Sequence, residues 1–269
     1  MSIKSKVEGM KAIWRFDNRW ELLLSRTLFR NDNLNIYRIK GMEILVDHGA
    51  GDPNGARHVL VSSMYQRFLS RMELNGSLNV LDLGANGGGF PLMLHVNKLR
   101  LGKLACVEFN PNTFSRLRFN IERNLKCEFT GINAAICGER RELQVQLGSG
   151  STGDSIYQPS PEQSAAGSVY RIDGLTFDDI YNSTFQDEVV DICKMDVEGA
   201  EYEVFASAHH ECIKRCRYLI VEIHNVEDRR PEEVVSELKR QGFEEIAVDS
   251  KTDPDVHLFG NTRFNHQTL

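Results

Sequence analysis

The chain has 269 residues, of which 41% are hydrophobic and 26% are charged, and its formal net charge is −6. This length suits one large domain or one domain with appendages, and the composition is that of a soluble globular protein. The negative net charge argues against a polyanion-binding surface, because proteins that bind nucleic acid usually carry a basic patch.

Membrane and export signals are missing from the sequence. No segment approaches the roughly 18 apolar residues that are needed to span a bilayer. The first nine residues, MSIKSKVEG, lack the apolar core of a signal peptide. We therefore predict a cytoplasmic protein with no membrane span.

The first 75 residues carry no recognisable motif and are predicted to form a cap on the domain that follows. In chain order we expect an amphipathic helix over 10–30, two short strands within 34–48 that turn at Lys40-Gly41, a loop over 47–55 and a helix over roughly 56–73. The cap, residues 1–75, would help form a substrate pocket. Its apolar first helix could also join two copies in a homodimer. Trp14 and Trp20 are expected to pack within this helix rather than to stack on a sugar ring.

From position 76 onward, apolar strand patterns alternate with helical ones. This alternation predicts an α/β domain over 76–269 with a largely parallel sheet covered by helices on both faces. We expect strands near 79–83, 104–108, 131–136, 189–195 and 218–223, an antiparallel closing pair at 243–248 and 256–259, and helices near 90–100, 112–124, 199–208 and 231–241. An insertion over about 139–180 contains an alternating strand at 143–147 and a polar loop at 148–155.

The most specific segment is the first strand of this domain and its glycines, NVLDLGANGGGF at 79–90. A buried parallel strand delivers such a loop to the carboxyl edge of an open sheet, where ligands bind. A dinucleotide fingerprint needs Gly-x-Gly-x-x-Gly, but the middle glycine counted from Gly84 falls at Asn86. The acidic-Gly-x-x-x-Gly form, from Asp82 to Gly88, resembles motif I of class I S-adenosylmethionine (SAM) methyltransferases. The alternative is a glycine turn that binds no ligand.

The second apolar strand, LACVEFNP at 104–111, contains an acid at its carboxyl end. In nucleotide-binding α/β folds, an acid at the end of the second strand accepts hydrogen bonds from the ribose hydroxyls. Glu108 is therefore predicted to bind the ribose. Together with the glycine loop it predicts SAM as the cofactor.

Two later segments bring further polar side chains to the same edge. The strand within 189–205, VVDICKMDVEGAEYEVF, ends at Asp196, and a helix follows it. Asp196 and Glu198 would then lie where an acceptor meets the methyl group, although they could instead cap the helix. Glu201 falls in the first helical turn, where the helix dipole favours acids.

The next strand, YLIVEIH at 218–224, brings Glu222 and His224 to the carboxyl edge. A lone histidine is usually structural. At the carboxyl end of a strand, beside the predicted cofactor loop, His224 is more readily explained as a site residue.

These segments resemble the FkbM family of SAM-dependent O-methyltransferases. The resemblance covers about residues 78–260 and rests on LDLGANGGG at 81–89, VEFNP at 107–111, LTFDD at 175–179, KMDVEGAE at 194–201 and VEIH at 221–224. It implies the Rossmann-like class I fold with a seven-stranded, mostly parallel sheet. It also implies methylation of hydroxyls on sugars and glycans or on polyketide natural products. Phe177 stands where the family usually has leucine, which puts nothing catalytic in doubt.

The resemblance also implies the roles of individual residues. The predicted cofactor-binding residues are Asp82, Gly84, Asn86, Gly88, Glu108, Asn110 and Ala134. The glycine loop would surround the amino-acid end of SAM, and Asp82 would orient its ammonium through water or backbone groups. Ala134, at the end of the third strand, would line the adenine.

The reaction needs an in-line approach of the hydroxyl oxygen and a base that accepts its proton. His224 is the first candidate, because neutral imidazole accepts a proton near pH 7. Asp196 is the second, and Glu222 completes the predicted catalytic set. A divalent metal such as Mg²⁺, held by Asp196 and Glu222 or by Glu198, could instead lower the pKa of the hydroxyl. The spacing of these residues does not require one.

Two other classes of function stay open. One is a SAM methyltransferase that acts on RNA, protein or nitrogen. However, the place of the Asn/Asp-Pro-Pro-aromatic tetrad of many base N-methyltransferases reads Asp196-Val-Glu-Gly199. The other is a SAM-binding protein without catalysis, for which the carboxylates at the edge would be superfluous. We predict an O-methyltransferase whose partner is a small hydroxyl acceptor, a sugar, glycan or polyketide, and not nucleic acid.

Overall fold

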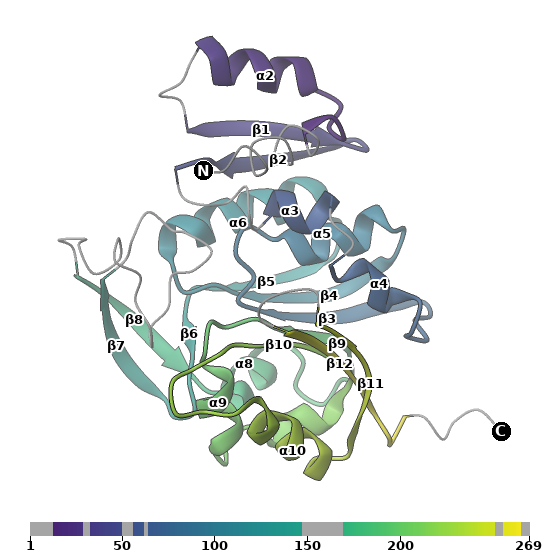
Figure 1. Ribbon diagram of the computed structural model, residues 1–269, viewed down its shortest axis with the longest axis vertical. Helices are drawn as coiled ribbons and strands as arrows, with labels where there is room; N and C mark the ends of the chain where they lie inside the picture. The colour runs from purple at the N-terminus through teal and green to yellow at the C-terminus, as the bar shows by residue number, and fades with distance from the viewer. Residues whose placement is uncertain are drawn as a thin grey trace.

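A seven-stranded sheet forms the centre of the computed structural model, which describes residues 13–28, 33–49, 56–61, 64–146, 169–250 and 255–264 (Figure 1). Its strands, in spatial order, are β11 (Phe243–Asp249), β12 (Asp255–Asn261), β10 (Cys216–Ile223), β9 (Val190–Met195), β3 (Ser77–Leu83), β4 (Arg100–Val107) and β5 (Glu128–Ile132). The five strands from β10 to β5 are parallel, and β12 is antiparallel to both its neighbours. The predicted mostly parallel sheet with an antiparallel closing pair is confirmed.

Two hydrophobic cores cover the two faces of this sheet. Along β3, Val80 belongs to the first core and Leu81 to the second, and along β4 Leu104 and Ala105 alternate in the same way. Strands that are buried on both faces read as nearly continuous apolar runs. This is why the sequence located them.

Helices lie on both sides of the sheet, as predicted (Figure 1). On one side are α5 (Gly89–Val96) and α6 (Pro111–Asn124), and on the other are α8 (Phe177–Thr184), α9 (Glu201–Ala206), the 3₁₀ helix η1 (Glu211–Arg215) and α10 (Pro231–Arg240). Thr176 and Asp179 form a capping box at the start of α8, which fixes where the helix begins. Phe177, the departure from the family pattern, is fully buried in the second core.

The insertion forms a small three-stranded sheet, in the order β6 (Ala135–Ile136), β8 (Val169–Leu175), β7 (Arg141–Gln146). The strand predicted at 143–147 is confirmed as β7. The polar loop predicted at 148–155 lies outside the described residues. The strand predicted over 131–136 is two strands in different sheets, β5 and β6. They are separated at Asn133, whose side chain turns back to donate to the carbonyls of Glu108 and Phe109.

The N-terminal segment contains α2 (Arg19–Leu28), β1 (Leu34–Ile39), β2 (Met42–Asp47), α3 (Ala56–Val61) and α4 (Gln66–Leu69). The hairpin of β1 and β2 turns at Lys40 and Gly41, as predicted, and both have positive φ angles. The predicted loop at 47–55 lies outside the described residues from position 50 onward. Tyr37, Ile44 and Val46 of the hairpin are fully buried in the same core as α5 and α6, so the hairpin packs onto the domain.

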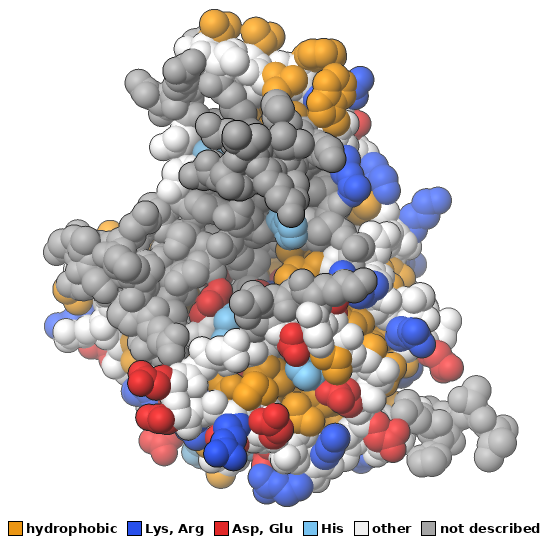
Figure 2. Space-filling view, in the orientation of Figure 1, with side chains coloured by type: hydrophobic (Ala, Val, Ile, Leu, Met, Phe, Trp, Pro, Cys, Tyr) orange, Lys and Arg blue, Asp and Glu red, His pale blue; other side chains and the backbone are white. Residues whose placement is uncertain are grey.

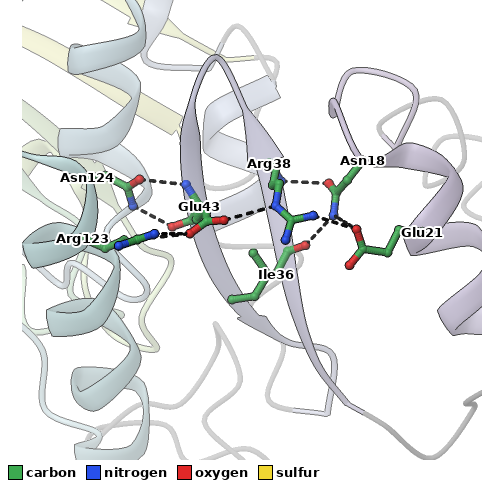
Figure 3. Close-up of polar contacts among 7 residues, drawn as sticks. All are labelled: Asn18, Glu21, Ile36, Arg38, Glu43, Arg123 and Asn124. Carbon is green, nitrogen blue, oxygen red and sulfur yellow. Dashed lines mark hydrogen bonds and ion pairs between the residues drawn. The ribbon is translucent and has the colours of Figure 1, made fainter.

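A chain of polar contacts joins α2, the hairpin and α6 (Figure 3). Arg38 pairs with Glu21 of α2 at 2.8 Å and with Glu43 of β2 at 3.2 Å, and Glu43 pairs with Arg123 of α6 at 2.7 Å. The backbone N–H of Glu43 also donates to Asn124 Oδ1 at 2.8 Å. Exposed ion pairs contribute about 0–1 kcal/mol each. The buried apolar contacts therefore contribute most to holding this layer in place.

Three predictions for this segment are wrong. The helix predicted over 10–30 is interrupted: Ile13 is helical, residues 14–18 form a turn, and α2 begins at Arg19. Asn18, just before α2, binds the backbone of β1 through its side chain, accepting from Arg38 N at 2.9 Å. The helix predicted over 56–73 is two short helices, because a turn at Met64-Tyr65 separates them. Trp14 and Trp20 are 53% and 62% exposed, since α2 packs on the hairpin through its opposite side. Among the described residues, no helix is long and apolar enough to cross a membrane.

Candidate functional site

The chain reverses its direction of growth across the sheet between β3 and β9. From β3 it proceeds to β4 and then β5 on one side, whereas β9 and β10 lie on the other side. In open α/β sheets, ligands bind at the carboxyl ends of the strands at such a switch point. The loops that follow β3, β4, β9 and β10 carry most of the site residues predicted from the sequence.

The loop after β3 is shaped by backbone contacts. Gly84 has φ +73°, and a Cβ there would lie 1.7 Å from the carbonyl oxygen of Asp196, so only glycine fits. Gly88 has φ +83° and is the N-cap of α5, and a Cβ there would lie 3.0 Å from the side chains of Leu117 and Ile121. The glycine at position 84 therefore lets the loops after β3 and β9 touch. Its predicted contact with SAM stays a prediction.

Asp82 lies beneath this loop and is completely buried. Its carboxylate is 3.5 Å from Lys194 Nζ, and neither oxygen has a hydrogen-bond partner among the described residues. Burial raises the pKa of Asp82 to about 6, and the charge of Lys194 opposes the shift. With no exposed surface, Asp82 reaches a ligand only through the loop or a buried water.

Lys194 joins the two halves of the site. Its ammonium donates to the carbonyl of Gly84 at 3.0 Å and pairs with Asp196 Oδ2 at 3.1 Å. Burial disfavours the charge on Lys194, but the carboxylates of Asp196 and Asp82 outweigh burial and raise its pKa. Lys194 is 4% exposed and was missed from the sequence. A lysine within an apolar strand run was the available signal, because lysine is almost never fully buried unless paired.

Glu108 connects the loops after β3 and β4. Its carboxylate accepts from the backbone N–H of Asn86 at 3.0 Å and from that of Asn110 at 2.8 Å. Asn110 also caps α6, accepting from the N–H groups of the first turn. Ala134 is buried beside Asn133, which contacts the backbone at Glu108. The predicted ribose and adenine residues thus lie together, and part of their role is to hold the loops.

A histidine and three carboxylates gather at the ends of β9 and β10. His224 Nδ1 is 2.5 Å from Glu201 Oε1, and its Nε2 is 3.4 Å from Glu198 and 3.8 Å from Asp196. Glu201 is the first residue of α9 and is completely buried. A carboxylate at Nδ1 accepts its proton and leaves Nε2 facing the other two acids. The orienting role of Glu201 was missed, because its place in a first helical turn already explained an acid there.

The pKa values of this group are strongly perturbed. Burial disfavours the charge on His224, but the hydrogen bond to Glu201 and the charges of Glu201, Asp196 and Glu198 raise its pKa to about 9. Burial, together with the charge of Asp196, raises the pKa of Glu198 to about 7. The raised pKa favours the protonated imidazole at pH 7, whereas the sequence-based prediction relied on its neutral form.

Glu222 lies on the other side of Asp196, beneath Tyr65. The Tyr65 hydroxyl donates to Glu222 Oε2 at 3.0 Å and lies 3.5 Å from Asp196 Oδ2. Burial and the charge of Asp196 raise the pKa of Glu222 to about 8. Tyr65 belongs to the N-terminal segment and was missed, because no sequence pattern connects that segment with the end of β10.

Among the described residues, one group has a geometry that could hold a metal ion. It consists of Asp196, Glu198 and His224, with one ligand atom from each within 4.8 Å of the others. Glu222, which the sequence suggested as a ligand, is not part of this group.

One family model covers most of the α/β domain. Residues 82–245, more than half of the chain, match the family model described as the methyltransferase FkbM domain. No curated protein sequence matches the chain.

Among solved structures, the chain is similar to methyltransferase FkbM from Methylobacillus flagellatus KT. The identity is 16% and the TM-score 0.48, over 74% of this chain and 47% of that one. It is also similar to a tRNA (uracil-54, C5)-methyltransferase of Pyrococcus abyssi bound to S-adenosyl-L-homocysteine, with 12% identity and a TM-score of 0.40 over 85% of this chain and 44% of that one. For fibrillarin of Aeropyrum pernix with natively bound SAM, the values are 13% and 0.45, over 85% and 94%. The chain spans less than half the length of the first two.

Proposed function

The chain belongs to the FkbM methyltransferase family, and from that premise we propose that it is a SAM-dependent O-methyltransferase. It transfers the methyl group to a hydroxyl of a small molecule: a sugar, a glycan or a polyketide-type natural product. The observation that carries this proposal is a histidine at the end of β10 whose Nδ1 is held by a buried carboxylate, 2.5 Å away. Such an arrangement suits a base that removes a proton from a weakly nucleophilic hydroxyl.

The residues at the edge of the sheet fit SAM. Five carboxyl groups lie at the ends of β3, β4, β9 and β10, and among the described residues Lys194 and His224 are the cations that pair with them. The five are Asp82, Glu108, Asp196, Glu198 and Glu222. SAM brings two cationic groups, a sulfonium and an ammonium, and no phosphate. Acidic surroundings suit it and would repel the pyrophosphate of a dinucleotide. When bound, SAM supplies the methyl group as an electrophile.

His224 is the proposed base and Glu201 its positioning residue. His224 Nδ1–H donates to the Glu201 carboxylate, and Nε2 is left to accept the proton of the hydroxyl. With a pKa of about 9, the neutral form of His224 increases about tenfold for each pH unit up to that value. The rate should therefore rise toward alkaline pH. Asp196, 3.8 Å from Nε2, is the second candidate base.

Asp196 and Glu222 were predicted to hold Mg²⁺, but Lys194 competes with such an ion for Asp196. The ammonium of Lys194 already lies 3.1 Å from Asp196, and Glu222 accepts a hydrogen bond from Tyr65. With its pKa raised to about 8 by burial, Glu222 is mostly neutral at pH 7 and a poor ligand. We derive no step through a metal, and we expect the rate to be the same with added Mg²⁺ or a chelator.

The proposal is tested by incubating the protein with methyl-labelled SAM and a panel of sugars, glycans, macrolides and RNA. The expected product is an ether formed on a sugar or macrolide hydroxyl. His224→Gln should lower the rate by about 10²–10⁴ while binding SAM as before. His95→Gln, at an exposed histidine in the last turn of α5, is the matched control and should be unchanged. Label that enters RNA, protein or a nitrogen atom would exclude the proposed reaction.

A further inference from the structure

The side of α2 that faces away from the hairpin is apolar and exposed. Trp20, Leu24 and Leu28 recur every fourth residue there and are 62%, 56% and 68% exposed. Trp14, which is 53% exposed, packs edge-on against Trp20 with 5.3 Å between ring centroids. These four residues are called the outer face of α2. Figure 2 shows hydrophobic side chains gathered at the top of the molecule, where Figure 1 places α2.

The packing of α2 on its own domain does not account for this face. Leu22 of α2 is already buried, and so are Ile13 and Phe16, which precede the helix. All three belong to the hydrophobic core that also contains the buried residues of the hairpin. A surface helix usually has one apolar stripe and a polar opposite side. A contiguous exposed apolar patch marks a surface that another body covers.

The charge of the N-terminal segment indicates what that body is. Residues 1–49 contain nine Lys and Arg against six Asp and Glu, whereas the rest of the chain contains 23 against 32. The one acid of α2, Glu21, is paired with Arg38 at 2.8 Å. The guanidinium of Arg19 lies over the ring of Trp14, 5.6 Å from its centroid. The N-terminal segment thus has a net positive sequence in an otherwise acidic protein, and its described residues expose two tryptophans and two leucines.

We propose that the outer face of α2 binds an anionic lipid surface. Tryptophan and leucine side chains with flanking arginines are the composition of helices that lie in the membrane interface. Anionic headgroups attract the net positive N-terminal segment and repel the acidic remainder of the chain, which sets the orientation. A second copy of the chain fits less well, because a stable protein interface involves roughly 20–30 residues on each side. This proposal is independent of the methyl-transfer reaction.

The test uses the fluorescence of the full chain, whose only two tryptophans both lie in the outer face of α2. The protein is titrated with vesicles of phosphatidylcholine alone and of phosphatidylcholine with phosphatidylglycerol, and binding is confirmed by flotation. We expect a blue shift and flotation with the phosphatidylglycerol vesicles only. Salt should weaken the binding, because it screens the charges.

Leu24→Glu combined with Leu28→Glu should weaken binding to these vesicles at least about tenfold while leaving both fluorophores in place. The matched control is Val169→Glu combined with Val248→Glu, at two apolar residues that are 58% and 42% exposed on other elements. Thermal unfolding checks that both variants fold. The proposal is overturned if no blue shift occurs, if both vesicle types bind equally, or if the shift follows protein concentration without vesicles. In the last case a doubled mass in sedimentation would identify a second copy as the occupant.

Discussion

Replacing Glu201 by Gln should lower the pKa of His224 and show that the buried carboxylate sets the state of the base. Glu201 Oε1 lies 2.5 Å from His224 Nδ1, and the side chains are 0% and 13% exposed, so solvent screens the pair weakly. Glutamine keeps the shape and an accepting oxygen but removes the negative charge. The variant thus tests the charge and not the packing.

The size of the effect follows from the hydrogen bond. A hydrogen bond to a charged group contributes about 1.5–3 kcal/mol, and one pKa unit corresponds to about 1.4 kcal/mol. The pKa of His224 should therefore fall from about 9 to between about 7 and 8.

The same shift determines how the pair contributes to stability. Because the pKa of His224 is raised in the folded protein, its contribution is complete below the unfolded value of 6.5 and disappears as the pH rises through about 9. In Glu201→Gln the contribution should be smaller and should disappear at lower pH.

The assay is an NMR titration of the imidazole nitrogens, which needs no acceptor. The chain has eight histidines, and the signals that vanish in His224→Gln assign the residue. Once an acceptor is found, Glu201→Gln should also shift the inflection of the pH–rate profile to lower pH than in the wild type. An unchanged inflection in Glu201→Gln, or titration of the wild-type residue near 6.5, would refute the reasoning.

Further predictions concern the loop after β3 and the residues around Glu222. Gly84→Ala and Gly76→Ala both place alanine at φ near +74°, which costs about 1–2 kcal/mol. Only the first collides with the Asp196 carbonyl, whereas the second meets nothing within 4 Å. Urea unfolding should show a loss of about 4 kcal/mol or more for Gly84→Ala, and equal losses would contradict the geometry. Tyr65→Phe removes the hydrogen bond to Glu222 and should cost about 1 kcal/mol in the same assay; an unchanged stability would argue against the bond. Because burial raises the pKa of Glu222 from 4.5 to about 8, this group disfavours folding progressively between those pH values. In thermal scans, Glu222→Gln should lose less stability than wild type from pH 5 to pH 8, and parallel curves would count against the shift.

Local sequence patterns were sufficient to predict the sheet and the edge that carries the site. The run from 79 to 90 identifies a buried strand and a glycine loop because burial on both faces and positive φ angles restrict residue type at each position. The sequence predicted that Asp196, Glu222 and His224 lie near one another because strand ends in a parallel sheet meet at one edge.

The missed residues depend on contacts between distant segments. Tyr65 reaches Glu222 across 157 positions of the chain, and Lys194 reaches the Gly84 carbonyl across 110. No local periodicity encodes such contacts. The two tryptophans were predicted to pack in the protein, and this was wrong for a related reason. Apolar spacing predicts that a helix has a stripe, but it does not tell which side of a helix with two stripes meets the core.

Calorimetric titration of the purified protein with SAM, and separately with NAD, tests the central claim most directly. We predict micromolar binding of SAM and no response to NAD. Glu108→Ala should weaken the affinity for SAM at least tenfold, about 1.4 kcal/mol. Glu108→Gln, which can still accept one of the two backbone hydrogen bonds, should have an intermediate affinity. A folded protein that does not bind SAM would contradict the methyltransferase account and leave the glycine loop as a structural connection between β3 and α5.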